Sequence, residues 1–166
     1  MKLSLKKMLK YNRNRNVALL SAEKNTTGEK NVFEGLTACL SDLNTGKSGE
    51  WIIDRENDGT SEHPLHFPFV DYSDVARRDE HEIYNIVDVH PEPELTNYQK
   101  ILERNGIERR TKRMENAEVS KLDAQCVMAL LVGAVRADRF CEGTFKGFID
   151  NGCIFRWIER LKEIES

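Results

Sequence analysis

The chain has 166 residues, of which 39% are hydrophobic and 32% are charged, and its formal net charge at neutral pH is -3. This length suits one domain with a single hydrophobic core, and the composition excludes both a fully disordered chain and a membrane-embedded one. No apolar run approaches the roughly 20 residues that a helix needs to cross a bilayer, and the basic start lacks the apolar segment of a secretory signal. We therefore expect a cytoplasmic protein with reduced cysteines.

The charges are distributed unevenly along the chain. Residues 2–15 carry six basic side chains and no acid, residues 51–94 are strongly acidic, and residues 104–113 are basic again. Such blocks keep a protein soluble, attract one another within a fold or steer partners. The two basic patches are candidates for contacts with nucleic-acid phosphates, although the acidic overall balance is unusual for a dedicated nucleic-acid-binding protein.

The first part of the chain contains two helical patterns followed by an irregular stretch. Apolar spacing predicts a short amphipathic helix over residues 3–11 and a second helix over residues 31–43. Residues 44–65 are rich in Gly, Ser, Asn and Asp, which predicts a loop. At most a short strand or hairpin is expected near residues 50–70.

Helical signals dominate the second half. Ser73 is the predicted N-cap of a helix that must end before Pro91, and the next helix is expected to begin at Thr96 and to stop at Asn105. Further apolar spacing predicts a short helix that ends at Asn151 and a last amphipathic helix after it.

The strongest local signal is the apolar run from Cys126 to Val135. Ser120 and Asp123 before it have the Ser-x-x-Asp spacing of a capping box, which predicts that a helix begins there. Because this run is apolar on nearly every face, only a helix surrounded by the rest of the fold is compatible with it. The sequence therefore predicts a mainly α protein, an irregular helical bundle around one central apolar helix.

The same patterns divide the chain into three predicted parts. Residues 1–50 form an N-terminal helical extension that is basic at its start, residues 51–72 an irregular acidic connection, and residues 73–166 the helical core domain.

Several segments resemble a known family. Residues 136–143 read Arg-Ala-Asp-Arg-Phe-Cys-Glu-Gly, and residues 152–161 read Gly-Cys-Ile-Phe-Arg-Trp-Ile-Glu-Arg-Leu. Together with residues 67–73 and 95–98, these segments are similar to a family of uncharacterised bacterial proteins that is classed as a domain of unknown function. The resemblance implies a shared fold and a bacterial origin, and it brings no activity, ligand or catalytic residue with it.

Charged side chains gather at the predicted junction after the central helix, where Arg136, Asp138, Arg139 and Glu142 follow one another closely. The acids can pair with Arg139 inside the fold, or the two guanidinium groups can bind a small anionic ligand. Cys141 is a candidate reactive thiol, because an arginine and a helix N-terminus both lower the pKa of a thiol. Free cysteines, however, more often behave as small buried hydrophobic residues.

The sequence contains no complete catalytic set. The spacing of its four histidines matches no recognised metal site, and we expect neither a metal nor another cofactor. The favoured hypothesis is a non-catalytic interaction module that binds an unknown protein or a small anionic ligand away from membranes. One alternative is a nucleic-acid-binding accessory protein that uses residues 2–15 and 104–113. Another is an enzyme that acts on a small anionic substrate at residues 136–142.

Overall fold

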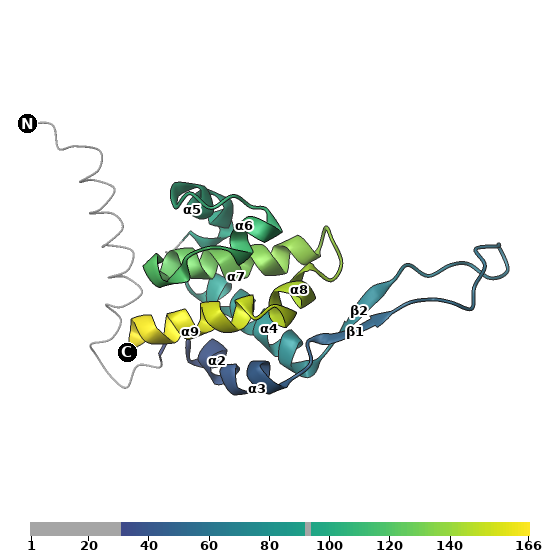
Figure 1. Cartoon of the computed structure of the whole chain (residues 1–166), viewed down its shortest axis with the longest axis horizontal. Coiled ribbons are helices and arrows are strands. Elements are labelled where there is room, and N and C mark those ends of the chain that lie inside the picture. Colours follow the sequence, from purple (N-terminus) through teal and green to yellow (C-terminus); the bar gives the residue numbers. More distant parts are fainter. Residues whose placement is uncertain (1–30, 92–93) are drawn as a thin grey trace, which may run out of the picture.

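The computed structural model describes residues 31–91 and 94–166, which are mostly helical (Figure 1). This confirms the predicted mainly α fold with one short hairpin. The helix predicted over residues 3–11 and the basic patch at residues 2–15 lie outside the described residues. In chain order the elements are α2 (Glu34–Ala38), α3 (Leu40–Thr45), β1 (Gly49–Ile52), β2 (Phe69–Tyr72), α4 (Asp74–Val89), the 3-10 helix η2 (Leu95–Asn97), α5 (Tyr98–Arg104), α6 (Thr111–Glu115), the 3-10 helix η3 (Val119–Lys121), α7 (Ala124–Asp138), α8 (Thr144–Asp150) and α9 (Cys153–Glu165).

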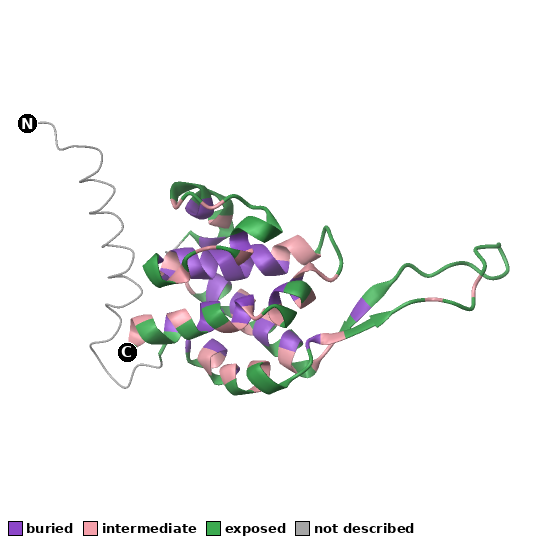
Figure 2. Ribbon diagram, in the orientation of Figure 1, coloured by how far each residue is buried: buried purple, intermediate pink, exposed green. Residues whose placement is uncertain are grey.

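Helix α7 forms the centre of the core. Every residue from Cys126 to Val135 is buried, and the helix packs against α4, α5, α8 and α9. Figure 2 shows this helix buried along most of its length, while the helices around it are exposed on their outer faces. The all-apolar run therefore occupies the position that its composition predicts, because no face of it is left to water.

The start of α7 differs from the prediction. Ser120 lies in η3, and the N-cap residue of α7 is Asp123, whose carboxylate accepts a hydrogen bond from the Cys126 amide at 2.9 Å. Leu122, between them, has an extended backbone and a buried side chain, so the chain leaves η3 before it enters α7. The predicted capping box is therefore wrong, because the N-cap of α7 is Asp123 and not Ser120.

The single helix predicted over residues 31–43 is divided into α2 and α3 at Cys39. Phe33 and Leu36 are buried in the same core as α7 and α9, and both short helices pack against α9 and α4. Helix α6 has no counterpart in the prediction. The signals at Ser73, Asn105 and Asn151 are confirmed, because each residue flanks a helix end as expected.

The two strands form an antiparallel hairpin that projects away from the helices (Figure 1). The register pairs Gly49 with Tyr72, and the loop between the strands covers residues 53–68. Gly49 has a φ of 144°, and a Cβ atom there would collide with the backbone of the opposite strand. This glycine therefore allows the strands to approach where the hairpin leaves the core.

The described helices include none with the length and apolar character that crossing a membrane requires.

Candidate functional site

The hairpin and its loop, residues 49–72 and hereafter the arm, carry most of the exposed large apolar side chains in the described part of the chain. Phe67 is 91% exposed, and no other residue of the described chain covers it. Such a concentration on one projecting element is typical of interaction sites, because single scattered apolar residues are the norm elsewhere on a surface. The exposed large apolar residues of the arm are Trp51, Ile52, Ile53, Leu65, Phe67 and Phe69.

Strand register separates the arm into two faces. Trp51 pairs with the buried Val70, and both point toward the α7–α8 junction. Ile52 pairs with Phe69 on the opposite face, where both side chains are exposed. Phe67 lies two residues before Phe69, at the alternate position that an extended chain places on the same side. The arm therefore presents an apolar strip that faces away from the core.

The arm is also acidic. Its residues include six carboxylates against one guanidinium, that of Arg55. Within the ladder Glu50 stands directly opposite Asp71, and like charges in this position repel. Lys47 lies 3.6 Å from Glu50 and Arg77 2.7 Å from Asp71, so nearby cations offset this repulsion at the base of the arm. The other four carboxylates lie in the loop, so the exposed apolar side chains are surrounded by negative charge.

Asp54 orders the loop of the arm. Its carboxylate accepts hydrogen bonds from the Asn57 side chain at 2.7 Å and from the His66 amide at 3.0 Å, so it joins the two sides of the loop. Hydrogen bonds from Asn57, His66 and the Glu56 amide hold the pKa of Asp54 well below its usual range. The loop therefore keeps this negative charge across the physiological pH range.

The same loop contains a spacing that sequence reasoning did not use. Asp54, Glu56 and Asp58 alternate and are followed by Gly59, as in the first half of a calcium-binding EF-hand loop. Across residues 31–91 and 94–166, however, no three side chains of metal-ligand type converge. In the structure Asp54 instead serves as the hydrogen-bond acceptor that closes the loop.

The predicted charged cluster lies where α7 meets α8, and its acids hold the arm to the core. Glu142 accepts a hydrogen bond from the Val70 amide at 2.8 Å. Asp138 accepts one from the Tyr72 hydroxyl at 2.9 Å and another from the Phe145 amide at 2.9 Å. Burial, and next the bond to Asp138, raise the pKa of Tyr72, so its hydroxyl remains a donor. Both acids thus bind arm groups.

The arginines of the cluster make different contacts. Arg136 lies over the ring of Tyr98, with 5.5 Å between guanidinium carbon and ring centroid, and donates to the Thr96 carbonyl at 3.3 Å. Arg139 lies over the ring of Tyr84 at 5.4 Å. Among the described contacts, neither arginine pairs with Asp138 or Glu142. Both cations therefore pack on aromatic faces, an arrangement that stabilises by about 0.5–1 kcal/mol at exposed positions.

The four cysteines are free thiols, and Cys141 is exposed whereas the other three are buried. Cys141 lies at the tip of the α7–α8 junction beside Phe140, which is 92% exposed. Cys141 is thus the cysteine that solvent reaches most easily among the four. Its reactivity stays a prediction.

A second anchor of the arm was not predicted, because its members are far apart in the sequence. Lys146 of α8 donates to the Ser48 hydroxyl at 3.0 Å and to the Asp150 carboxylate at 2.6 Å, and Ser48 donates to Asp150. Ser48 is buried, immediately before β1. A cavity of about 570 Å³ adjoins these three side chains. They form a closed network in which Lys146 is already paired with a carboxylate, so the network fixes the base of the arm to α8.

Gly143 allows the arm to rest on the junction. Its φ of 83° is left-handed, and a Cβ atom there would collide with the ring of Trp51. Replacing Gly143 with alanine is therefore expected to lower the free energy of unfolding by about 1–3 kcal/mol. Gly147→Ala is the matched control, because a Cβ at position 147 within α8 meets nothing within 4 Å. That change is expected to add about 0.5–1 kcal/mol, through helix propensity. Urea denaturation measures both, and equal effects would contradict the contact of Trp51 with Gly143.

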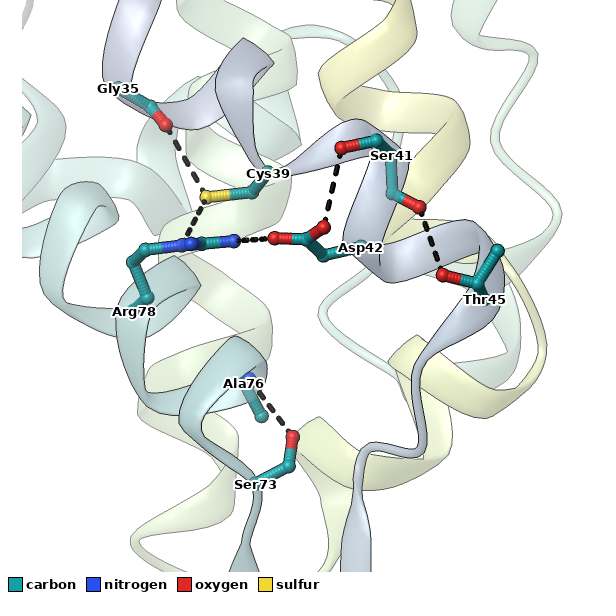
Figure 3. Close-up of polar contacts among 8 residues, drawn as sticks. All are labelled: Gly35, Cys39, Ser41, Asp42, Thr45, Ser73, Ala76 and Arg78. Carbon is teal, nitrogen blue, oxygen red and sulfur yellow. Dashed lines mark hydrogen bonds and ion pairs between the residues drawn. The ribbon is translucent and has the colours of Figure 1, made fainter.

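A polar cluster joins α3 to the first turns of α4 (Figure 3). Arg78 of α4 donates to the Cys39 thiol at 3.2 Å and to the Asp42 carboxylate, and this arginine holds the pKa of Asp42 below its usual value. Burial, and next the nearby Asp79, raise the pKa of Cys39 to about 12. The Cys39 thiol is therefore neutral and unreactive at physiological pH.

Asp79 is fully buried beside this cluster, and its two carboxylate oxygens have no hydrogen-bond partner among the described residues. Burial raises the pKa of Asp79 to about 6, while Cys39 and Arg78 lower it by less. Burying a carboxylate without partners destabilises a fold, because the charge loses its hydration. Asp79 is thus a destabilising position, and neither the sequence patterns nor the arm explains why a carboxylate is buried there.

The basic patch at residues 104–113 lies on and before α6. Arg110 and Arg113 lie 3.5 Å and 3.9 Å from the carboxylate of Glu108, and all three side chains are largely exposed. Glu108 therefore offsets part of the positive charge of this patch. Exposed ion pairs of this kind contribute little to the free energy of unfolding.

Residues 93–166, somewhat less than half of the chain, match a family of unknown function (DUF6508). The matched residues include the α7–α8 junction and exclude the arm. Comparisons with curated proteins and with solved structures find no match. The predicted resemblance to a domain of unknown function is therefore confirmed for these residues, and the bacterial origin stays a prediction.

Proposed function

We propose that this protein is a non-catalytic interaction module of the bacterial cytoplasm that binds a basic polypeptide segment through its arm. The observation that carries the proposal is the exposed apolar strip of Ile52, Phe67 and Phe69 beside the acidic loop of the arm. Apolar side chains at the centre of an interface supply binding energy, and charges around them select a partner of opposite sign. A partner segment with apolar and basic residues fits both features.

The attachment of the arm supports the same proposal. Hydrogen bonds from Val70 and Tyr72 to the junction, together with the Ser48 network, fix the base of the arm to α7 and α8. A binding element that is held in place before the partner arrives loses less conformational entropy on binding. Asp138 and Glu142, which belong to the same charged cluster as the candidate anion-binding arginines, are engaged in this attachment. This engagement favours a binding arm over a catalytic junction.

Affinity capture with single-site variants tests the proposal. Phe67→Ser removes the most exposed ring of the arm, and Phe140→Ser removes an equally exposed ring outside it. The wild-type protein and the Phe140 variant are expected to enrich the same basic polypeptide from a host lysate at low salt, and the Phe67 variant is expected to lose at least ten-fold of it. Equal enrichment by all three proteins would rule out the arm as the docking element.

A further inference from the structure

We propose that the N-terminal segment of the chain, residues 2–15, binds to the arm of the same molecule and occupies it until an external partner displaces it. The inference rests on the proposed function, since it names the chemistry that the arm recognises and a way in which its access is regulated. The structure describes the surface of the arm, and residues 2–15 lie outside the described residues and are considered by their sequence.

The segment and the arm have complementary charges. Residues 2–15 carry six basic side chains and no acid, whereas the arm carries six carboxylates and one guanidinium. Asp54 and Asp58 in the loop have pKa values held below the usual range by hydrogen bonds, from Asn57 and from Thr60 respectively, so both stay ionised. Opposite charges of this density attract within the Debye length, about 10 Å at 0.1 M salt. No other segment of comparable length in the sequence is basic without any acid.

The segment and the arm also both carry apolar side chains. The segment places Leu5, Met8 and Leu9 at the spacing of one helical face, among lysines. The arm offers Phe67 and the cross-strand pair of Ile52 with Phe69, which no described residue covers. Burying these side chains against one another removes apolar area from water on both sides.

Chain length permits this contact within one molecule. The segment from residue 31 to Gly49 includes the helices α2 and α3, whose rise of about 1.5 Å per residue limits its span to about 40 Å. The fifteen residues 16–30 reach up to about 50 Å when extended. Because the segment and the arm belong to one chain, this contact does not depend on the protein concentration. An external partner must then compete with the segment.

Hydroxyl-radical footprinting of the full-length protein tests the proposal. Phe67 and Phe140 are 91% and 92% exposed, so without a covering segment radicals should oxidise the two rings at similar rates. We expect Phe67 to be oxidised at least three-fold more slowly than Phe140 at low salt. The triple variant Lys6→Glu, Lys7→Glu, Lys10→Glu is expected to remove this protection, as is 1 M salt.

The matched control reverses the other basic patch, with Arg109→Glu, Arg110→Glu and Lys112→Glu, and is expected to leave Phe67 protected. Equal oxidation of the two rings in the wild-type protein would overturn the inference, and so would protection that the triple variant at residues 6–10 retains. Protection that grows with protein concentration would contradict binding within one molecule and assign the segment to a second copy. None of these outcomes bears on capture by the Phe67→Ser variant, so the proposed function is judged separately.

Discussion

Replacing Leu130 with alanine is expected to lower the free energy of unfolding by about 3–5 kcal/mol. Leu130 lies in the middle of α7 and is fully buried, with the helices α4, α5, α8 and α9 packed around its helix. The truncation removes apolar contacts and leaves a cavity that neighbours on all sides hold open. A loss of this size is a large share of the about 5–15 kcal/mol that stabilises a typical domain. Chemical denaturation monitored by circular dichroism measures it.

Two controls separate the position from the chemistry. Leu130→Met conserves volume and is expected to cost less than about 1.5 kcal/mol. Leu65→Ala makes the same chemical change on the exposed loop of the arm and is expected to cost less than about 0.5 kcal/mol. A loss below about 1 kcal/mol for Leu130→Ala would mean that α7 is not the centre of the core.

Replacing Asp79 with alanine is expected to stabilise the protein by about 2 kcal/mol at pH 8. The pKa of Asp79 is raised from 3.8 to about 6 by burial, so folding favours the protonated carboxyl and opposes the charged one. The corresponding penalty at high pH is about 3 kcal/mol, of which the small cavity left by alanine offsets about 1 kcal/mol. Alanine also removes two buried oxygens that lack partners among the described residues.

The pH dependence identifies the cause. Because the folded-state pKa lies above the unfolded one, the penalty is absent below about pH 4, grows between pH 4 and pH 6, and is constant above that window. The stability difference between the Asp79→Ala variant and the wild type is therefore expected to rise across this window. Asp88→Ala removes an exposed carboxylate from the same helix and serves as the matched control. A difference that does not change with pH would contradict a raised pKa at Asp79.

Sequence reasoning succeeded where one local signal determines the structure. The run from Cys126 to Val135 is apolar on every face, and only the middle of a fold accommodates such a helix. Ser73 and Asn151 are confirmed as helix boundaries because capping is an interaction between residues close in sequence. The predicted capping box at Ser120 is wrong because burial of Leu122, a tertiary effect, moved the start of the helix to Asp123.

The site was predicted only in part. Residues 136–142 were singled out by their charges, but the groups that Asp138 and Glu142 contact come from β2, more than sixty residues earlier. The network of Ser48 with Lys146 likewise joins residues 98 positions apart. Local patterns do not contain such pairings, because they depend on how the elements pack. The exposed side chains of the arm were present in the sequence, but only the register of the strands shows which of them share a face.

Photocrosslinking from the arm tests most directly whether it contacts a partner. Phe67 is replaced by p-benzoylphenylalanine in one variant of the full chain and Phe140 in another, and both are irradiated in a host lysate. We expect a covalent adduct with a basic polypeptide from position 67 that disappears at high salt, and none from position 140. The absence of any crosslink at position 67, either to another polypeptide or to residues 2–15 of the same chain, would contradict the arm as the binding element, and so would the same adducts from both positions.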